Sequence, residues 1–216
     1  MTILFDLDGT LIDSTDAILQ SFAYSYEQTS TEIPDDHQIE SLIGYPLDII
    51  YQKLGMQHSE IEHHVGLYKQ KYRQISKDLT VLLPDAKEAI VAASKFARLG
   101  VVTTKTARYS KELLEHFEVL DYFELLVGRE DVVNPKPHPE PVLKAVEFFQ
   151  CDRDKCWLIG DTLLDIGSAD AANINSVAVL SGYNNIDQLK TLTSFIQKDA
   201  LSAVNFIKKT GITATI

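Results

Sequence analysis

Cysteine, long apolar runs and excess positive charge are all scarce in this 216-residue sequence. Its two cysteines, Cys151 and Cys156, are too few for a disulfide framework and too far apart for a Cys-x-x-Cys redox pair. No apolar run reaches the ~18 residues of a membrane-spanning helix, and the first residues form neither a basic leader nor a long apolar region. We therefore expect a cytoplasmic protein with no membrane partner.

Basic residues are outnumbered by acidic ones, 20 against 31, which gives a formal net charge of −11. Such a charge disfavours a sequence-independent grip on the phosphate backbone, so we expect no nucleic-acid partner. An anionic substrate would be repelled as well, and a local cation or basic side chain would have to attract it. The sequence leaves the oligomeric state open.

Apolar segments alternate with helical patterns along most of the chain. Hydrophobic residues make up 45% of the sequence and charged residues 24%, as in soluble globular proteins. The predicted strands are residues 2–5, 101–103, 125–127, 156–159 and 176–180. The predicted helices between them are residues 84–98, 110–117, 140–149 and 166–173. This alternation predicts an α/β fold with a doubly wound parallel sheet.

One long segment interrupts the alternation. Between residues 14 and 80 the sequence contains no strand pattern, only amphipathic helical patterns separated by turns. We predict a helical domain of residues 14–80, inserted into an α/β core domain formed by residues 1–13 and 81–216.

The first candidate site follows the first predicted strand, in the run Asp6-Leu7-Asp8-Gly9-Thr10. Ligand sites in parallel α/β sheets lie outside the carboxyl ends of strands, and Gly9 permits a tight turn there. Two carboxylates this close can take different roles, one as an ionised nucleophile or ligand and the other as a proton donor.

A second acidic pair, Asp161 and Asp165, follows the predicted strand 156–159 and opens a helix. Carboxylates gathered from two strand ends repel one another unless a hard cation lies among them, and oxygen ligands suit magnesium. Asp165 has an equally good alternative role as an acid that interacts with the dipole at the amino end of the helix.

Hydroxyl and ammonium groups follow two further predicted elements. Thr103 and Thr104 end the second strand and can donate to a phosphoryl oxygen, although threonine is also an ordinary strand residue. Lys136 lies between two prolines on a stiff loop, where its charge could neutralise a phosphate or a nucleophile.

Taken together, these motifs resemble those of the haloacid dehalogenase superfamily, in order and at the corresponding strand ends. The segments that carry the resemblance are Asp6-Leu7-Asp8-Gly9-Thr10-Leu11, Thr103, Lys136-Pro137-His138-Pro139 and Gly160-Asp161 with Asp165. The inserted helices resemble the cap that this superfamily places after its first motif. The runs around Thr103 and Lys136 resemble the phosphoglycolate phosphatase-like branch.

The resemblance implies a magnesium-dependent phosphatase that hydrolyses a small phosphate monoester, phosphoglycolate-like or a sugar phosphate, through an aspartyl-phosphate. It makes Asp6 the nucleophile and Asp8 the general acid and then base, and it gives Thr103 and Lys136 the task of holding the phosphoryl group. Thr104 is implied as a helper at the same group.

The resemblance also implies the metal ligands, which are a carboxylate oxygen of Asp6, the backbone carbonyl of Asp8 and the side chain of Asp161, with Asp165 close by. Backbone N–H groups of the turn that holds Gly9 and Thr10 would receive the transferring group. Tyr45, beside Gly44 in a turn of the cap, is a candidate for substrate recognition.

Four other functions have to be weighed against a phosphatase. A dehalogenase would not need Asp8, and a phosphonatase would need a cap lysine, for which Lys53 is a candidate. A phosphotransferase or mutase would need a cap that excludes water, which the sequence does not report. A non-enzymatic binding module is disfavoured because every expected reactive position is occupied.

Overall fold

The computed structural model describes the backbone of residues 1–213 and the side chains of residues 1–210. Its main sheet contains six parallel strands in the order β5-β4-β1-β6-β7-β8. They are β1 (Thr2–Phe5), β4 (Arg98–Val102), β5 (Leu125–Val127), β6 (Cys156–Gly160), β7 (Asn175–Val179) and β8 (Ile196–Gln197). The predicted parallel α/β fold is confirmed, but β4 begins three residues earlier than predicted and the short edge strand β8 was not predicted.

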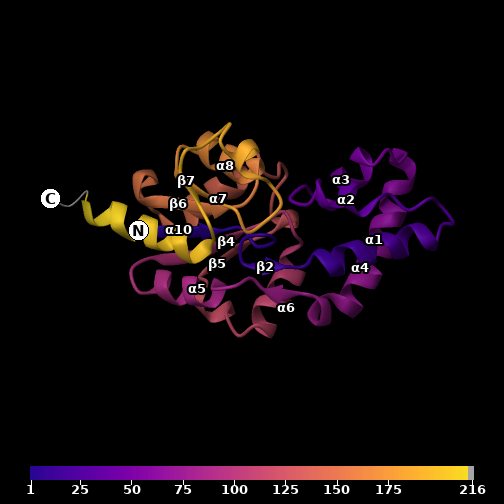
Figure 1. The fold of residues 1–216 in the computed structure, drawn as a ribbon, viewed down its shortest axis with the longest axis horizontal. Coiled ribbons are helices and arrows are strands. Elements are labelled where there is room, and N and C mark those ends of the chain that lie inside the picture. The colour runs from indigo at the N-terminus through magenta and orange to yellow at the C-terminus, as the bar shows by residue number, and fades with distance from the viewer. Residues whose placement is uncertain (214–216) are drawn as a thin grey trace.

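Helices cover both faces of this sheet (Figure 1). Ile3 and Phe5 on β1 point to a core formed with α5, α6 and α10, whereas Leu4 between them points to a second core formed with α7 and α8. Alternate side chains of a strand face opposite sides, so β1 is apolar throughout because both its faces are buried. The helices are α5 (Ala86–Ser94), α6 (Ala107–His116), α7 (Glu140–Phe149), α8 (Leu163–Ala171) and α10 (Ala200–Thr213). Shorter helices between them are α9 (Ile186–Leu189) and the 3-10 helices η1 (Leu120–Tyr122), η2 (Arg129–Asp131) and η3 (Arg153–Lys155).

Four further helices project from one side of the sheet and form what we call the helical unit (Figure 1). They are α1 (Thr15–Glu27), α2 (Asp36–Glu40), α3 (Leu47–Lys53) and α4 (His58–Leu79). The helical unit has a core of its own, in which Phe22, Tyr51 and Tyr72 are almost completely buried. Tyr109 of α6 also joins this core, so the helical unit packs against the α/β part of the chain.

The chain enters and leaves the helical unit through two short strands that lie side by side. β2 (Ile12–Asp13) and β3 (Val81–Leu82) pair antiparallel, with Ile12 opposite Leu82. The sequence did not predict this pair, because two-residue strands carry no periodic pattern. This pairing holds the two ends of the helical unit together, close to the end of β1.

The parallel strands bring chemically active residues to one edge of the sheet. Asp6 follows β1, Thr103 follows β4 and Asp161 follows β6. Since neighbouring parallel strands end on the same side, Asp6 and Asp161, 155 positions apart in the sequence, come close together there.

Candidate active site

Asp6 lies at the end of β1, where its backbone N–H donates to the carbonyl of Ile159 at 2.9 Å. The side chain is only 4% exposed, and its Oδ1 atom has no hydrogen-bond partner among the described residues. Lys136 Nζ lies 3.0 Å from that oxygen and forms an ion pair with it. Burying a carboxylate oxygen that accepts no hydrogen bond destabilises the folded protein unless a ligand binds that oxygen. Asp6 Oδ1 is therefore an atom that could bind a cation or attack an electrophile.

Lys136 is the buried cation of the site. Its Nζ donates to the carbonyl of Val102 at 2.9 Å and to the carboxylate of Asp165. Burial alone would lower the pKa of Lys136, but the carboxylates of Asp165 and Asp6 outweigh it and raise that pKa above its ordinary value. Lys136 therefore stays charged and holds two carboxylates in place.

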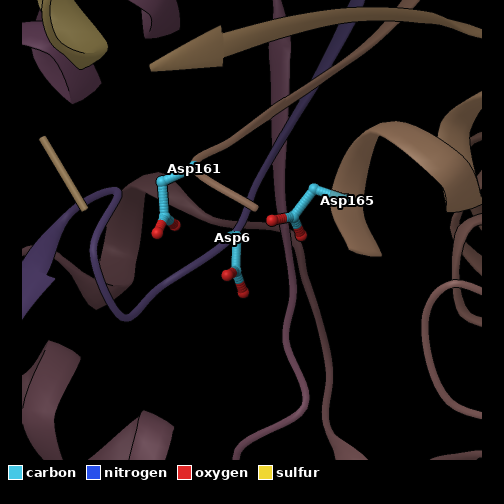
Figure 2. A group of neighbouring side chains, drawn as sticks. All are labelled: Asp6, Asp161 and Asp165. Atoms are coloured by element: carbon cyan, nitrogen blue, oxygen red, sulfur yellow. The ribbon is translucent and has the colours of Figure 1, made fainter. Parts of the chain in front are cut away.

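Three buried carboxylates, those of Asp6, Asp161 and Asp165, converge at this point (Figure 2). One oxygen from each lies within 4.8 Å of the others. Burial raises the pKa of Asp6 to about 7, although Lys136 opposes the shift, and burial together with the neighbouring carboxylates raises the pKa of Asp161 well above its ordinary range. One lysine against three buried carboxylates leaves an excess of negative charge, so a hard divalent cation with oxygen ligands fits this group.

The two carboxylates that follow β6 differ in how they are held. Asp161 accepts bonds from Thr10 Oγ1 and from the backbone N–H of Tyr183, both at 2.9 Å. Both oxygens of Asp165 are occupied, one by Lys136 and the other by the N–H and hydroxyl of Thr162 at 3.0 and 2.6 Å. The alternative role of Asp165 is thus present in the structure as a capping box at the start of α8.

Two glycines make room for Asp161. Gly9 has φ of +80°, a left-handed conformation that side chains rarely adopt, and a β-carbon there would collide with the Asp161 carboxylate. A β-carbon on Gly182 would collide with the same carboxylate. The turn after β1 and the loop after β7 therefore both close around Asp161.

Asp8 faces away from the carboxylate cluster and toward the helical unit. Its Oδ2 and Oδ1 atoms lie 2.8 and 3.1 Å from Lys105 Nζ, and Ser14 donates to Oδ1. Burial alone would lower the pKa of Lys105, but Asp8 and Tyr72 raise it. The side chain of Asp8 is therefore held toward the helical unit by Lys105 and Ser14.

The two threonines after β4 have different surroundings. Thr103 is 5% exposed, and its Oγ1 accepts the backbone N–H of Lys105 at 3.2 Å, so its hydroxyl hydrogen remains available to a ligand. Thr104 donates instead to the carbonyl of Gly44 at 2.7 Å. This hydrogen bond joins the α/β part of the chain to the helical unit.

A cavity of about 360 Å³ lies between the helical unit and the edge of the sheet. Asp8 and Thr104 line it from the sheet, and Tyr45 lines it from the helical unit. Lys53 does not line the cavity, and its Nζ lies over the ring of Tyr45, 4.5 Å from the ring centroid.

The sequence did not predict a role in the site for Lys105, Ser14 or Tyr183. Lys105 follows Thr103 and Thr104 directly, so its position after β4 was a usable signal. The contribution of Tyr183 is a backbone N–H, which any residue except proline supplies, so its identity carries no signal.

Within residues 1–213, none of the helices is long and apolar enough to cross a membrane.

The chain resembles several known proteins over most of its length. It is 35% identical over 182 residues to "Putative pyrophosphatase PpaX" of Caldanaerobacter subterraneus subsp. tengcongensis, covering 82% of this chain and 80% of that protein. It is 28% identical over 191 residues to a phosphoglycolate phosphatase of Nitrosococcus oceani, covering 85% of each.

Solved structures resemble its fold equally well. A haloacid dehalogenase-like hydrolase structure from Bacteroides fragilis has a TM-score of 0.86 at 26% identity, covering 91% of this chain and 96% of that one. A phosphatase structure from Clostridium acetobutylicum has a TM-score of 0.87 at 24% identity, covering 96% and 98% of the two chains, and supports the fold alone. The family model of haloacid dehalogenase-like hydrolases matches residues 3–179. The chain belongs to this family of hydrolases.

Proposed function

We propose that this enzyme is a magnesium-dependent phosphatase that hydrolyses small phosphate monoesters through an aspartyl-phosphate on Asp6. The observation that carries the proposal is the buried Asp6 oxygen without a hydrogen bond, 3.0 Å from Lys136 and inside a cluster of carboxylates. The names of its relatives, which include phosphoglycolate phosphatases, agree with this class of substrate.

The first step forms one bond and breaks one. A carboxylate oxygen of Asp6 attacks the phosphorus atom, and the bond between phosphorus and the ester oxygen breaks. Asp8 gives its proton to the departing oxygen, since its side chain faces the cavity. Lys136 lies 3.0 Å from Asp6, and Thr103 follows the neighbouring strand β4. Both would receive the phosphoryl oxygens, together with backbone N–H groups of the turn that holds Gly9 and Thr10.

The second step releases phosphate. Asp8 removes a proton from water, whose oxygen attacks the phosphorus of the aspartyl-phosphate, and the bond from phosphorus to Asp6 breaks. The metal would be held by Asp6, Asp161 and the backbone carbonyl of Asp8, with Asp165 nearby. When bound, magnesium supplies positive charge that offsets the repulsion between Asp6 and the anionic substrate.

We also propose that residues 14–80 act as a cap over the core formed by residues 1–13 and 81–216. The antiparallel pair of β2 and β3 and the hydrogen bond from Thr104 to Gly44 are the connections that support this division. Most of the apolar lining of the cavity comes from residues 14–80, so we assign the choice of leaving group mainly to the cap and name Tyr45 as a contact. Both cysteines are free thiols, which agrees with action in the cytoplasm.

Release of phosphate from p-nitrophenyl phosphate tests the proposal. We expect turnover with magnesium, no turnover in excess chelator, and a higher magnesium requirement for Asp161→Asn, because one charged ligand is lost. Asp152→Asn is the matched control, since Asp152 pairs with Lys155 on the surface. Full turnover in chelator would remove the metal from the mechanism, and no turnover under any condition would favour a non-enzymatic binding module.

A further inference from the structure

The cavity between the helical unit and the sheet edge is walled by aromatic side chains. Phe22, Tyr68, Tyr72 and Tyr109 line it, and each is at most 9% exposed. Their rings follow one another in contact, with centroids 5.1 Å apart for Phe22 and Tyr68, 5.6 Å for Tyr68 and Tyr72, and 5.7 Å for Tyr72 and Tyr109. A continuous aromatic wall favours an apolar or flat occupant over a heavily hydrated one.

The charges that line the cavity balance. Its cationic side chains are Lys69, Lys105 and Arg129, and its carboxylates are Asp8, Asp48 and Glu130. Lys105 is committed to Asp8 at 2.8 Å, and Arg129 lies 3.9 Å from Asp48 while donating to the carbonyl of Val132 at 3.1 Å. Lys69 aside, the cationic side chains are therefore paired, and the lining as a whole carries no net positive charge for a leaving group with a carboxylate or a second phosphate.

The volume of the cavity also argues against a very small leaving group. At about 360 Å³ it falls within the ~300–1,000 Å³ range of pockets that enclose drug-sized ligands. A two-carbon leaving group would fill a small part of it and leave most of the aromatic wall uncovered.

We propose that the cavity takes an uncharged, ring-sized and largely apolar leaving group, so that the substrates are phosphate monoesters of aromatic or cyclic alcohols. This inference rests on the proposed phosphatase function and names the substrate class of the same site. It separates this chain from an enzyme specialised for phosphoglycolate or pyrophosphate, whose leaving groups are anionic.

Benzyl phosphate and ethyl phosphate form the decisive pair of substrates, because both release a primary alcohol and differ mainly in the ring. We expect kcat/KM with magnesium to be at least ~10-fold higher for benzyl phosphate, the effect of filling an apolar pocket. Phosphoglycolate and inorganic pyrophosphate should both fall below benzyl phosphate. Equal values for the benzyl and ethyl esters, or a higher value for either anionic substrate, would overturn the proposal.

A cavity-filling variant locates the effect. Val65 lines the cavity from α4, whereas Leu67 on the same helix is similarly half-buried and does not line it. We expect Val65→Phe to reduce the ratio of benzyl to ethyl hydrolysis several-fold while ethyl hydrolysis persists, and Leu67→Phe to leave the ratio unchanged. A ratio unaffected by Val65→Phe in a folded protein would contradict the proposal, and the wild-type comparison decides it if that variant does not fold.

Failure of the substrate class and failure of the proposed function are distinguishable. If benzyl phosphate has no advantage but Asp6 becomes phosphorylated by another ester, only the substrate class is wrong. If no ester is hydrolysed and no phosphoenzyme forms, the phosphatase proposal fails and this inference fails with it.

Discussion

Replacing Lys136 by methionine keeps most of the side-chain volume but removes the positive charge between Asp6 and Asp165. Lys136 is 3% exposed and lies 3.0 Å from Asp6 Oδ1, so its loss leaves two buried carboxylates facing each other. Breaking a buried ion pair by removing one partner typically costs about 3–5 kcal/mol of the free energy of unfolding. We expect Lys136→Met to lose that amount in chelator, as measured by urea denaturation, and to lose activity as well.

A second substitution and a surface control make this prediction specific. Asp165→Asn removes one of the two buried carboxylate charges that Lys136→Met leaves without a cation, so the double variant should regain roughly 1–3 kcal/mol, a normal coupling energy for contacting residues. Lys155→Met breaks a surface pair with Asp152 in which both side chains are more than half exposed, and should change stability by less than ~0.5 kcal/mol. If Lys136→Met lowers the free energy of unfolding by less than ~1 kcal/mol, or if the double variant regains none of it, Lys136 is not the charge that stabilises these two carboxylates.

Three further variants test separate parts of the site. Asp8→Asn should lower kcat by roughly 10²–10⁴-fold with an alkyl phosphate. The loss should be smaller with p-nitrophenyl phosphate, because its leaving group needs no proton. Equal losses for the two substrates in single-turnover assays would contradict the role of Asp8 as acid. Gly182→Ala should weaken magnesium binding in calorimetric titrations, because its β-carbon would displace the Asp161 carboxylate. Burial raises the pKa of Asp6 from 3.8 to about 7, so the metal-free folded protein retains a proton there that the unfolded chain has lost. The contribution of this group to stability is present below about pH 4 and lost as pH rises through about 7, and Asp6→Asn should flatten that slope in denaturation curves recorded across this range.

The sheet and its strand-end acids could be predicted because their signals are local. The apolar run before Asp6-Leu7-Asp8-Gly9-Thr10 predicts a strand, and Gly9 predicts the turn that ends it. The apolar run before Asp161 predicts β6 in the same way. Parallel topology then brings the two strand ends together. The order of the motifs was therefore enough to place the carboxylate cluster.

Features that depend on distant pairing could not be predicted in the same way. β2 and β3 are two residues long and separated by the whole helical unit, so neither contains a recognisable period. The contact of Lys105 with Asp8 joins residues 97 positions apart, and a lysine after a strand is most often a surface residue. The aromatic wall depends on packing between helices of two parts of the chain, which only the folded structure reveals.

Trapping the covalent intermediate shows whether Asp6 is the nucleophile. The wild-type protein and Asp6→Asn are mixed with ³²P-labelled substrate and magnesium, quenched in acid within the first turnover, and digested to locate the label. We expect acid-stable label on the peptide that contains Asp6 in the wild-type protein and none in Asp6→Asn. Label that persists in Asp6→Asn, or rapid wild-type turnover through another labelled residue, would contradict it.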